Sequence, residues 1–260
     1  MLSGQNNNPP LSQVNDFVTS QPDTIEAVES TTFAIAFVAS LIPALFWLWF
    51  WLREDRKNPE PYLLILVSFI AGMAVVPLAL PLQEAVIGLY SDSNLMLVWV
   101  IIEEALKYFV ALIVILWNKA VDEPIDYIIY MIAIALGFAT LENTLFTLNP
   151  LSAGEYTTAA VTGSFRFLGA TLLHVLASAT IGVMIALAFY RSASVKLLYG
   201  TLGLFIAILL HALFNFFIMD ATGEGILIIF LFVWMGIIVL FLLFEKIKLL
   251  ESSQKPSSRK

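Results

Sequence analysis

The chain has 260 residues, of which 60% are hydrophobic and only 13% are charged, and its mean hydropathy is +0.88. These values exclude an ordinary soluble globular domain and indicate a membrane protein. The formal net charge of −7 comes without a basic stripe, so nucleic acid is not an expected partner. The absence of cysteine excludes a disulfide framework and a thiolate site.

Seven apolar stretches are long enough to cross a bilayer, which takes about 20 residues of helix. They lie at about 33–52, 62–82, 95–117, 125–148, 163–190, 198–219 and 225–244. The expected fold is therefore an all-α integral membrane protein with a single bundle of about seven transmembrane helices. Residues 1–30 and 251–260 are polar and predict flexible tails, which leaves 31–250 as the transmembrane domain.

The basic residues predict how the bundle is oriented. All basic residues except Lys107 and Arg166 lie in one set of connections or at the C-terminal end. They are Arg53, Arg56, Lys57, Lys119, Arg191, Lys196, Lys246, Lys248, Lys255, Arg259 and Lys260. The N-terminal tail and the connections near 83–94, 149–162 and 220–224 have no lysine or arginine. Cytoplasmic loops carry an excess of these residues, so the N-terminus is expected outside and the C-terminus in the cytoplasm.

Strongly polar residues inside the predicted helices are few and lie at similar depth. They are Glu103, Glu104 and Lys107 in the third helix, Glu142 and Asn143 in the fourth, His174 in the fifth, and His211 and Asn215 in the sixth. At about 1.5 Å of rise per residue, these groups lie roughly 9–17 Å below the outer helix ends. Four helices of alternating direction thus place polar groups in one layer, and both histidines of the chain belong to it.

Each polar residue alone has a plain structural explanation. Glu103 and Lys107 have the favourable i,i+4 order for an ion pair, and either histidine could be a packed, hydrogen-bonded side chain. Exposed to lipid, however, each charged group would cost about 3 kcal/mol, and leucine would serve a purely structural bundle better. The set as a whole predicts a buried functional site.

The same residues carry a family resemblance. "EEALK" at 103–107, "FATLEN" at 138–143, the isolated His174 and "HALFN" at 211–215 resemble the four motifs of the PrsW family of intramembrane proteases. That family is similar in turn to the CAAX prenyl proteases and the bacteriocin-processing membrane proteases. The resemblance covers roughly 95–219, the motif core, and it implies an intramembrane endopeptidase in a prokaryotic cell membrane.

The resemblance also implies roles for individual residues. Six would be catalytic: Glu103, Glu104, Glu142, His174, His211 and Asn215. Three would support them: Lys107, Phe138 and Asn143. One of the two adjacent glutamates would activate water, and the histidine and asparagine of "HALFN" would stabilise the oxyanion. The implied substrate is a single-span membrane protein, such as an anti-sigma factor or a peptide precursor, cut near the extracytoplasmic face.

The residue set leaves the need for a metal open. Two histidines with one or two carboxylates form a plausible zinc set, and zinc would polarise the carbonyl and activate water. The chain has no HExxH motif, however, and the candidate ligands come from different helices. The expectation is a metal-free site with no cofactor, and a zinc-dependent protease that uses the same residues is the alternative.

Three other classes of membrane protein explain the sequence less well. Buried Glu, Lys and His also build the ion relays of transporters, but the chain shows no inverted repeat. A retinal protein would need a lysine in the seventh predicted helix, which has none. A purely structural scaffold would not explain the polar layer.

Arg166, near the outer end of the fifth helix, is expected to anchor that helix at the interface, or else to contact the substrate.

Overall fold

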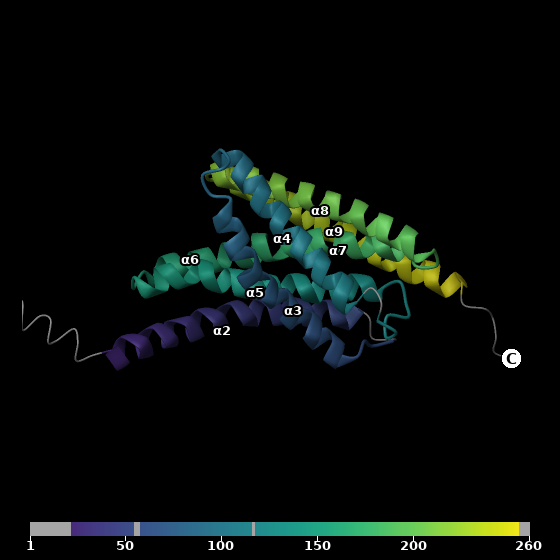
Figure 1. Ribbon diagram of the computed structural model, residues 1–260, viewed down its shortest axis with the longest axis horizontal. Helices are drawn as coiled ribbons and strands as arrows, with labels where there is room; N and C mark the ends of the chain where they lie inside the picture. The colour runs from purple at the N-terminus through teal and green to yellow at the C-terminus, as the bar shows by residue number, and fades with distance from the viewer. Residues whose placement is uncertain (1–21, 55–57, 116–117, 255–260) are drawn as a thin grey trace, which may run out of the picture.

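The computed structural model describes residues 22–54, 58–115 and 118–254, and these residues form helices joined by short connections. Within those ranges no strand is present. The helices, in chain order, are α2 (Pro22–Glu54), α3 (Tyr62–Ala85), α4 (Asp92–Val114), α5 (Asp126–Ser152), α6 (Tyr156–Phe165), η1 (Arg166–Ala170), α7 (Thr171–Leu187), α8 (Ala193–Asp220) and α9 (Glu224–Gln254). Short α6, the π-helical turn η1 and α7 follow one another without a break and form one long rod (Figure 1).

The helices confirm an all-α, multi-pass membrane protein. In the described part of the chain, six helical segments are long and apolar enough to span a bilayer. Helix α4 is 23 residues long and is not one of these six, and it carries three charged residues in its middle, Glu103, Glu104 and Lys107. Counted with α4, the helical rods correspond to the seven stretches expected from the sequence.

The bounds differ from the expected ones at both ends of the bundle. Helix α2 begins at Pro22, inside the stretch 1–30 that was expected to be a flexible tail, because proline suits the first turn of a helix. Helix α9 continues to Gln254, past the expected end of the domain. The rest of the predicted tails, 1–21 and 255–260, lies outside the described residues, as do positions 116–117 at the end of the third predicted helix.

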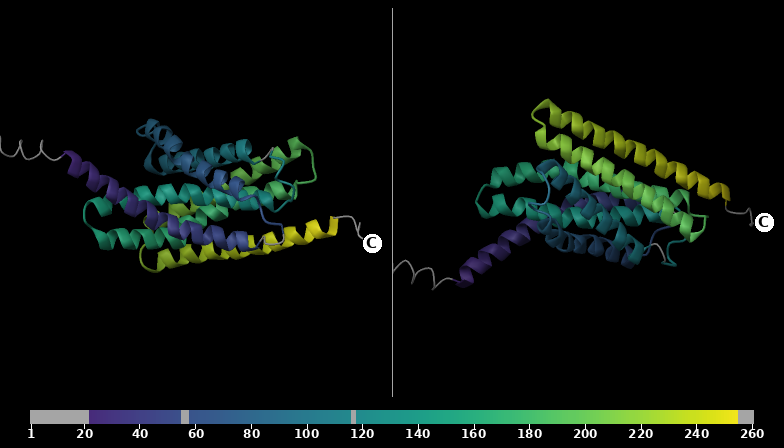
Figure 2. Two further views of the ribbon diagram at one scale, coloured as in Figure 1. Left: turned by 90° about the horizontal axis from the view of Figure 1, so that it is seen from below. Right: turned by 45° about the horizontal axis from the view of Figure 1, so that its top comes forward.

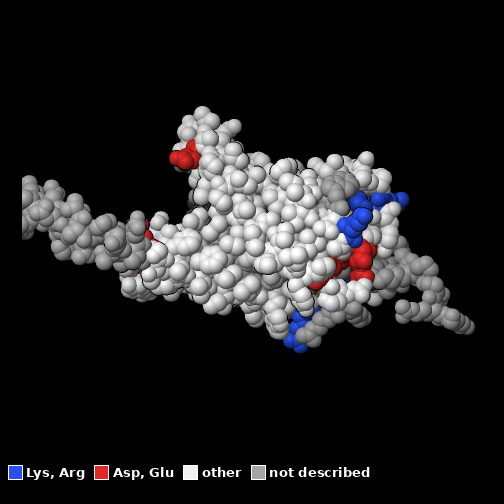
Figure 3. Space-filling view, turned by 60° about the horizontal axis from the view of Figure 1, so that its bottom comes forward, with Lys and Arg blue, Asp and Glu red and all other residues white. Residues whose placement is uncertain are grey.

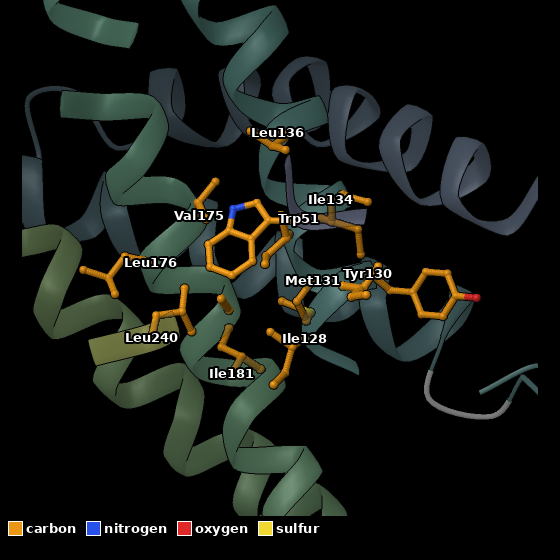
Figure 4. Close-up of a cluster of buried hydrophobic side chains, with 14 of the residues drawn as sticks. Trp51, Ile128, Tyr130, Met131, Ile134, Leu136, Val175, Leu176, Ile181 and Leu240 are labelled. Carbon is orange, nitrogen blue, oxygen red and sulfur yellow. The ribbon is translucent and has the colours of Figure 1, made fainter. Parts of the chain in front are cut away.

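Helices α5 and α7 form the centre of the bundle. Every side chain from Asp126 to Thr140 in α5 is buried, and so is every one from Thr171 to Ala179 in α7. Trp51 of α2 fills the space between these two helices and α9, among the aliphatic side chains that Figure 4 labels. The other helices pack around this centre and expose large apolar side chains along their outer faces, as a bilayer requires.

Two glycines allow α3 to cross α5 at very short range. A Cβ atom added to Gly72 would lie 2.0 Å from the carbonyl oxygen of Ile134, and one added to Gly137 would lie 1.9 Å from that of Phe69. No side chain fits at such distances, so small residues are required at this crossing. The crossing fixes where the second half of α3 runs beside α4 and α5.

The connections gather at two opposite ends of the bundle (Figures 1 and 2). Connections 86–91, 153–155 and 221–223 lie at the end where α2 begins, and they hold no lysine or arginine. Connections 58–61, 118–125 and 188–192 lie at the end where α9 finishes. Basic side chains gather at this second end in the face that Figure 3 shows. We call the first the N-terminal end of the bundle and the second the C-terminal end.

Candidate active site

A cavity of about 1200 Å³ occupies the half of the bundle nearer the N-terminal end. It lies between the second half of α3, the first half of α4, the second half of α5, the η1 region, the end of α8 and the start of α9. Most of its lining is apolar or aromatic. Six residues of the polar layer or next to it contribute to the wall: Glu103, Glu142, Arg166, His174, His211 and Asn215. The depth match read from the sequence therefore corresponds to a real convergence in space.

Helix α4 separates its two glutamates. Lys107 Nζ donates to Glu104 Oε1 at 2.6 Å, and both side chains are 0% exposed. The expected i,i+4 pair of Glu103 with Lys107 is therefore wrong, because the lysine turns inward to Glu104. Glu103 instead faces the cavity, where 12% of its side chain is exposed. Adjacent residues on a helix point about 100° apart, so only one of the two carboxylates can face the cavity.

The two histidines meet beside this pair. Their rings lie edge to face, with centroids 4.9 Å apart. His211 Nδ1 lies 2.8 Å from Glu104 Oε1, and Lys107 Nζ lies 3.2 Å from His174 Nδ1. A lysine ammonium has no acceptor, so His174 Nδ1 must accept this hydrogen bond. The proton of the neutral His174 ring then belongs on Nε2, which lies 3.0 Å from Glu142 Oε2 and donates to it.

Glu142 is shared between His174 and Arg166. Arg166 Nη2 donates to the same Glu142 oxygen that receives the histidine proton. His174 follows Arg166 by eight residues, which an uninterrupted α-helix would place about 80° apart around its axis. The π turn Arg166–Ala170 corrects this, because a π turn takes roughly one residue more than the 3.6 of an α turn. One turn of each kind makes about eight residues, so both side chains reach one carboxylate.

Arg166 is held firmly on the inside of the bundle. Its Nε donates to Asn143 Oδ1 at 2.5 Å, and its guanidinium lies 3.8 Å from the centroid of the Phe146 ring. Asn143 in turn donates from Nδ2 to Thr171 Oγ1 at 2.9 Å. The expectation that Arg166 anchors its helix at the interface is therefore wrong: it pairs with Glu142 and Asn143 and lines the cavity. A π turn has no reliable sequence signal, so sequence reasoning did not find this arrangement.

Within the described part of the chain, Glu103 turns an oxygen without a hydrogen-bond partner toward His211. Its Oε1 accepts a hydrogen bond of 2.8 Å from Gln83 Nε2 of α3, a residue that sequence reasoning missed. Its Oε2 is buried, has no hydrogen-bond partner among the described residues, and lies 3.9 Å from His211 Nε2. One ligand atom each from Glu103, His174 and His211 can be chosen so that all three lie within 4.8 Å of one another.

Two further residues of the motifs shape the same space. Phe138 packs edge-on against the ring of His174, with centroids 4.9 Å apart, and Lys107 Nζ lies 4.3 Å from the centroid of the phenyl ring. Asn215 lines the cavity one helical turn after His211. The contacts of the described residues include no hydrogen bond from its side chain, so its amide is available to a group in the cavity.

Comparison with known proteins decides the family. Residues 60–243 match the family described as PrsW family intramembrane metalloprotease. This chain belongs to the PrsW family. It is 26% identical over 210 residues to Protease PrsW of Clostridioides difficile (strain 630), a match that covers 76% of this chain and 84% of the relative. It is 27% identical over 192 residues to Protease PrsW of Bacillus subtilis (strain 168), covering 72% and 84%. No solved structure matches the chain.

Membership in the PrsW family makes this chain a peptidase, since these relatives are named proteases. Together with the apolar helices, the bacterial relatives place it in a prokaryotic cell membrane as a multi-pass protein. The matched range contains all four motifs and the whole polar layer. It also contains Gln83 and Arg166, which the motifs did not include.

The cavity residues of this PrsW-family chain suit a metal ion in part. With neutral histidines, the polar layer holds three carboxylates (Glu103, Glu104, Glu142) and two cations (Lys107, Arg166), so its net charge is 2 − 3 = −1. This excess, the free oxygen of Glu103 and the free Nε2 of a neutral His211 suit a cation. His174 suits it less, because Lys107 and Glu142 engage both of its ring nitrogens.

Proposed function

We propose that this protease hydrolyses a peptide bond of a membrane-bound protein inside the cavity, near the extracytoplasmic face, with water activated by Glu103. The observation that carries the proposal is the unpartnered Oε2 of Glu103, which faces His211 Nε2 at 3.9 Å inside a cavity large enough for a peptide segment. A small turn of the Glu103 side chain toward the cavity would let both groups hold one water molecule. A carboxylate placed within hydrogen-bond reach of a water is a common general base for it.

The surrounding residues supply the other parts of a hydrolysis. Glu103 takes a proton from water as the oxygen attacks the carbonyl carbon, and it returns the proton to the leaving amine. The developing oxyanion needs donors, and the free amide of Asn215 is one of them. His211 is the second donor when it is protonated, with Nδ1–H donating to Glu104 and Nε2–H directed to the oxyanion. A protonated His211 also brings the charge of the polar layer from −1 to zero.

Glu104, Glu142 and Lys107 have positioning roles in this scheme. Glu104 and Lys107 are too deeply buried to reach a substrate, and Glu104 fixes the ring of His211 through Nδ1. Glu142 fixes the ring of His174 and is itself fixed by Arg166. The roles of the two adjacent glutamates therefore differ: Glu103 acts on water, and Glu104 orients a histidine.

A zinc-dependent mechanism is the second candidate, and the grouping of three ligand atoms favours it. Glu103, His174 and His211 would hold the ion, with Glu104 and Gln83 as hydrogen-bond partners of two of these ligands. A bound zinc would supply Lewis-acid polarisation of the carbonyl and a more acidic water. The three atoms would have to move closer, since ligand atoms around tetrahedral zinc lie about 3.3 Å apart. His174 would also have to release Lys107, whichever of its two ring nitrogens held the ion.

Cleavage and metal content are measured together to test the proposal. The purified chain, reconstituted in vesicles with a panel of single-span bacterial membrane proteins, is expected to cut at least one of them within the outer half of its span. We expect this activity to survive prolonged treatment with a strong chelator. Stoichiometric bound zinc, with activity lost on chelation and restored by the metal, would replace the metal-free scheme by the zinc one. Ion-driven uptake without any cleavage would contradict both.

The extracytoplasmic position of the site rests on an orientation with the N-terminal end outside, supported by the basic residues at the C-terminal end. Because the chain has no cysteine, single cysteines at Ser91, Ser152 and Ser192 report directly on sidedness. An impermeant thiol reagent applied to intact cells is expected to label Ser91→Cys and Ser152→Cys and to spare Ser192→Cys. Labelling of Ser192→Cys alone would reverse the orientation and move the cleavage site to the cytoplasmic half.

The depth of the cavity and the family resemblance support a membrane-bound protein with a single span as the substrate. The cavity reaches Ile87 in the α3–α4 connection and Leu95 near the start of α4, both at the N-terminal end. A substrate that spans the membrane once can enter such a space from the bilayer with its scissile bond near the outer face. An anti-sigma factor or a membrane-bound peptide precursor has this topology.

A further inference from the structure

Gln83 is a polar residue of the cavity that belongs to none of the four motifs. It lies in the last turns of α3 and lines the cavity beside Glu103. Its side-chain amide donates from Nε2 to Glu103 Oε1 at 2.8 Å. Its backbone carbonyl accepts a hydrogen bond of 3.1 Å from Trp99 Nε1 of α4. Gln83 is therefore bound to α4 at two points, once through its side chain and once through its backbone.

The bond from Gln83 decides which oxygen of Glu103 is free. A carboxylate has two equivalent oxygens, and the amide occupies Oε1, so Oε2 is left to face His211 Nε2 at 3.9 Å. Without this bond the Glu103 side chain could rotate about its side-chain torsions. The free oxygen would then have no fixed direction toward the histidines.

The same bond keeps Glu103 apart from Lys107. These two residues have the i,i+4 spacing and the order that favour an ion pair on a helix. In the structure Lys107 pairs with Glu104 instead, and Glu103 turns to α3. A donor on α3 thus competes with the lysine for Glu103, which explains why the pairing expected from the sequence does not form.

An uncharged amide is the suitable donor at this place. A lysine or arginine at position 83 would form an ion pair that neutralises Glu103, and an acidic residue would repel it. Glutamine orients the carboxylate without changing the charge of the polar layer. Its own position is set by the Gly72–Gly137 crossing of α3 with α5 and by the bond from Trp99.

From these contacts we infer that Gln83 is a positioning residue, which holds Glu103 so that its free oxygen faces the reacting water. The inference rests on the proposed role of Glu103. Groups that hydrogen-bond to a catalytic or ligating carboxylate typically change activity or metal affinity by about 10–100-fold when they are removed. Gln83 touches Glu103 and acts through it.

The test compares Gln83→Leu and Gln83→Glu with the wild type and with Leu82→Ala. Leu82 is the neighbour of Gln83 on α3, is exposed, and does not line the cavity. Gln83→Leu keeps the approximate volume without the donor, so kcat should fall about 10–100-fold while KM and thermal stability in detergent stay near the wild-type values. Leu82→Ala should keep the wild-type kcat.

The pH dependence of Gln83→Glu distinguishes a positioning role from a merely structural one. The introduced carboxyl can donate to Glu103 only while it is protonated, so this variant should lose activity as the pH rises across a range where the wild type does not. In a double-mutant cycle, Gln83→Leu should have no further effect in a Glu103→Gln background. Such non-additivity would show that Gln83 acts through Glu103.

Two results would overturn the inference. One is a wild-type kcat for Gln83→Leu, and the other is a loss of activity in Gln83→Glu that is the same at every pH. If Glu103→Gln is inactive while Gln83→Leu has full activity, only the role of Gln83 is wrong. If Glu103→Gln itself cleaves at the wild-type rate, the proposed role of Glu103 is wrong, whatever Gln83 does.

Discussion

Replacing Glu103 with glutamine is expected to reduce cleavage about 10²–10⁴-fold without unfolding the protein. The amide has nearly the same shape as the carboxylate, so the bond with Gln83 can be kept by the new carbonyl oxygen. The group that faces His211, however, can no longer take a proton from water. Because Oε2 of the native side chain has no hydrogen-bond partner in the described part of the protein, its replacement breaks no hydrogen bond. The measurement is the single-turnover rate in vesicles.

Two further Glu→Gln variants serve as comparisons for Glu103→Gln. Glu155→Gln makes the same chemical change at an exposed position outside the cavity lining, and it should cleave at the wild-type rate. Glu104→Gln should also lose activity, since it weakens the pair with Lys107 and the contact that orients His211. It should in addition lower thermal stability, which Glu103→Gln should not. Wild-type rates in both Glu103→Gln and Glu104→Gln would show that the site is somewhere else.

The sequence predicted the polar layer because helix length and the positions of ionisable residues are enough to estimate depth. Glu103, Glu142, His174 and His211 come from four helices, and all four line one cavity. Apolar stretches interrupted by charged residues have few explanations in a bilayer. For the same reason, the all-α fold and the approximate helix ranges followed from hydropathy alone.

The contacts inside the layer could not be predicted in the same way. A helical wheel gives the direction of Glu103 and Lys107 but does not say which neighbouring helix supplies a competing donor, and Gln83 lies on α3. The direction of Arg166 depends on the π turn that follows it, which shifts every later residue around the helix axis. Such details are set by packing between helices, to which a single-sequence pattern has no access.

Helix ends at the membrane surface show a similar limit. The polar stretch before residue 30 predicted a tail, yet α2 begins at Pro22. The polar composition of this stretch indicates only that its residues lie outside the lipid. It does not exclude a helix that continues beyond the bilayer, where backbone hydrogen bonds are satisfied equally well by helix or by water.

Lys107→Met is expected to destabilise the fold by about 3–5 kcal/mol, the usual effect of removing one partner from a buried ion pair. Lys107 and Glu104 are both 0% exposed, and Glu104 Oε2 already lacks a partner in the described ranges. Methionine fills a similar volume, so the loss comes from the uncompensated carboxylate and from the hydrogen bond to His174. Thermal or denaturant unfolding in detergent measures it.

The double variant Lys107→Met/Glu104→Gln separates the effect on stability from the effect on catalysis. Removing both charges together leaves no buried ion without a partner, so most of the lost stability should return. Cleavage should not return, because His211 no longer has its carboxylate and His174 no longer has its lysine. Glu245→Gln is the matched control: Glu245 pairs with Lys248 at 2.8 Å with both side chains partly exposed, where such pairs contribute about 0–1 kcal/mol, and the hydrogen bond from Lys248 to the Glu54 carbonyl is kept. If the single and double variants unfold at the same point, the buried pair does not stabilise this protein. If the double variant cleaves at the wild-type rate, Lys107 and Glu104 do not position the histidines.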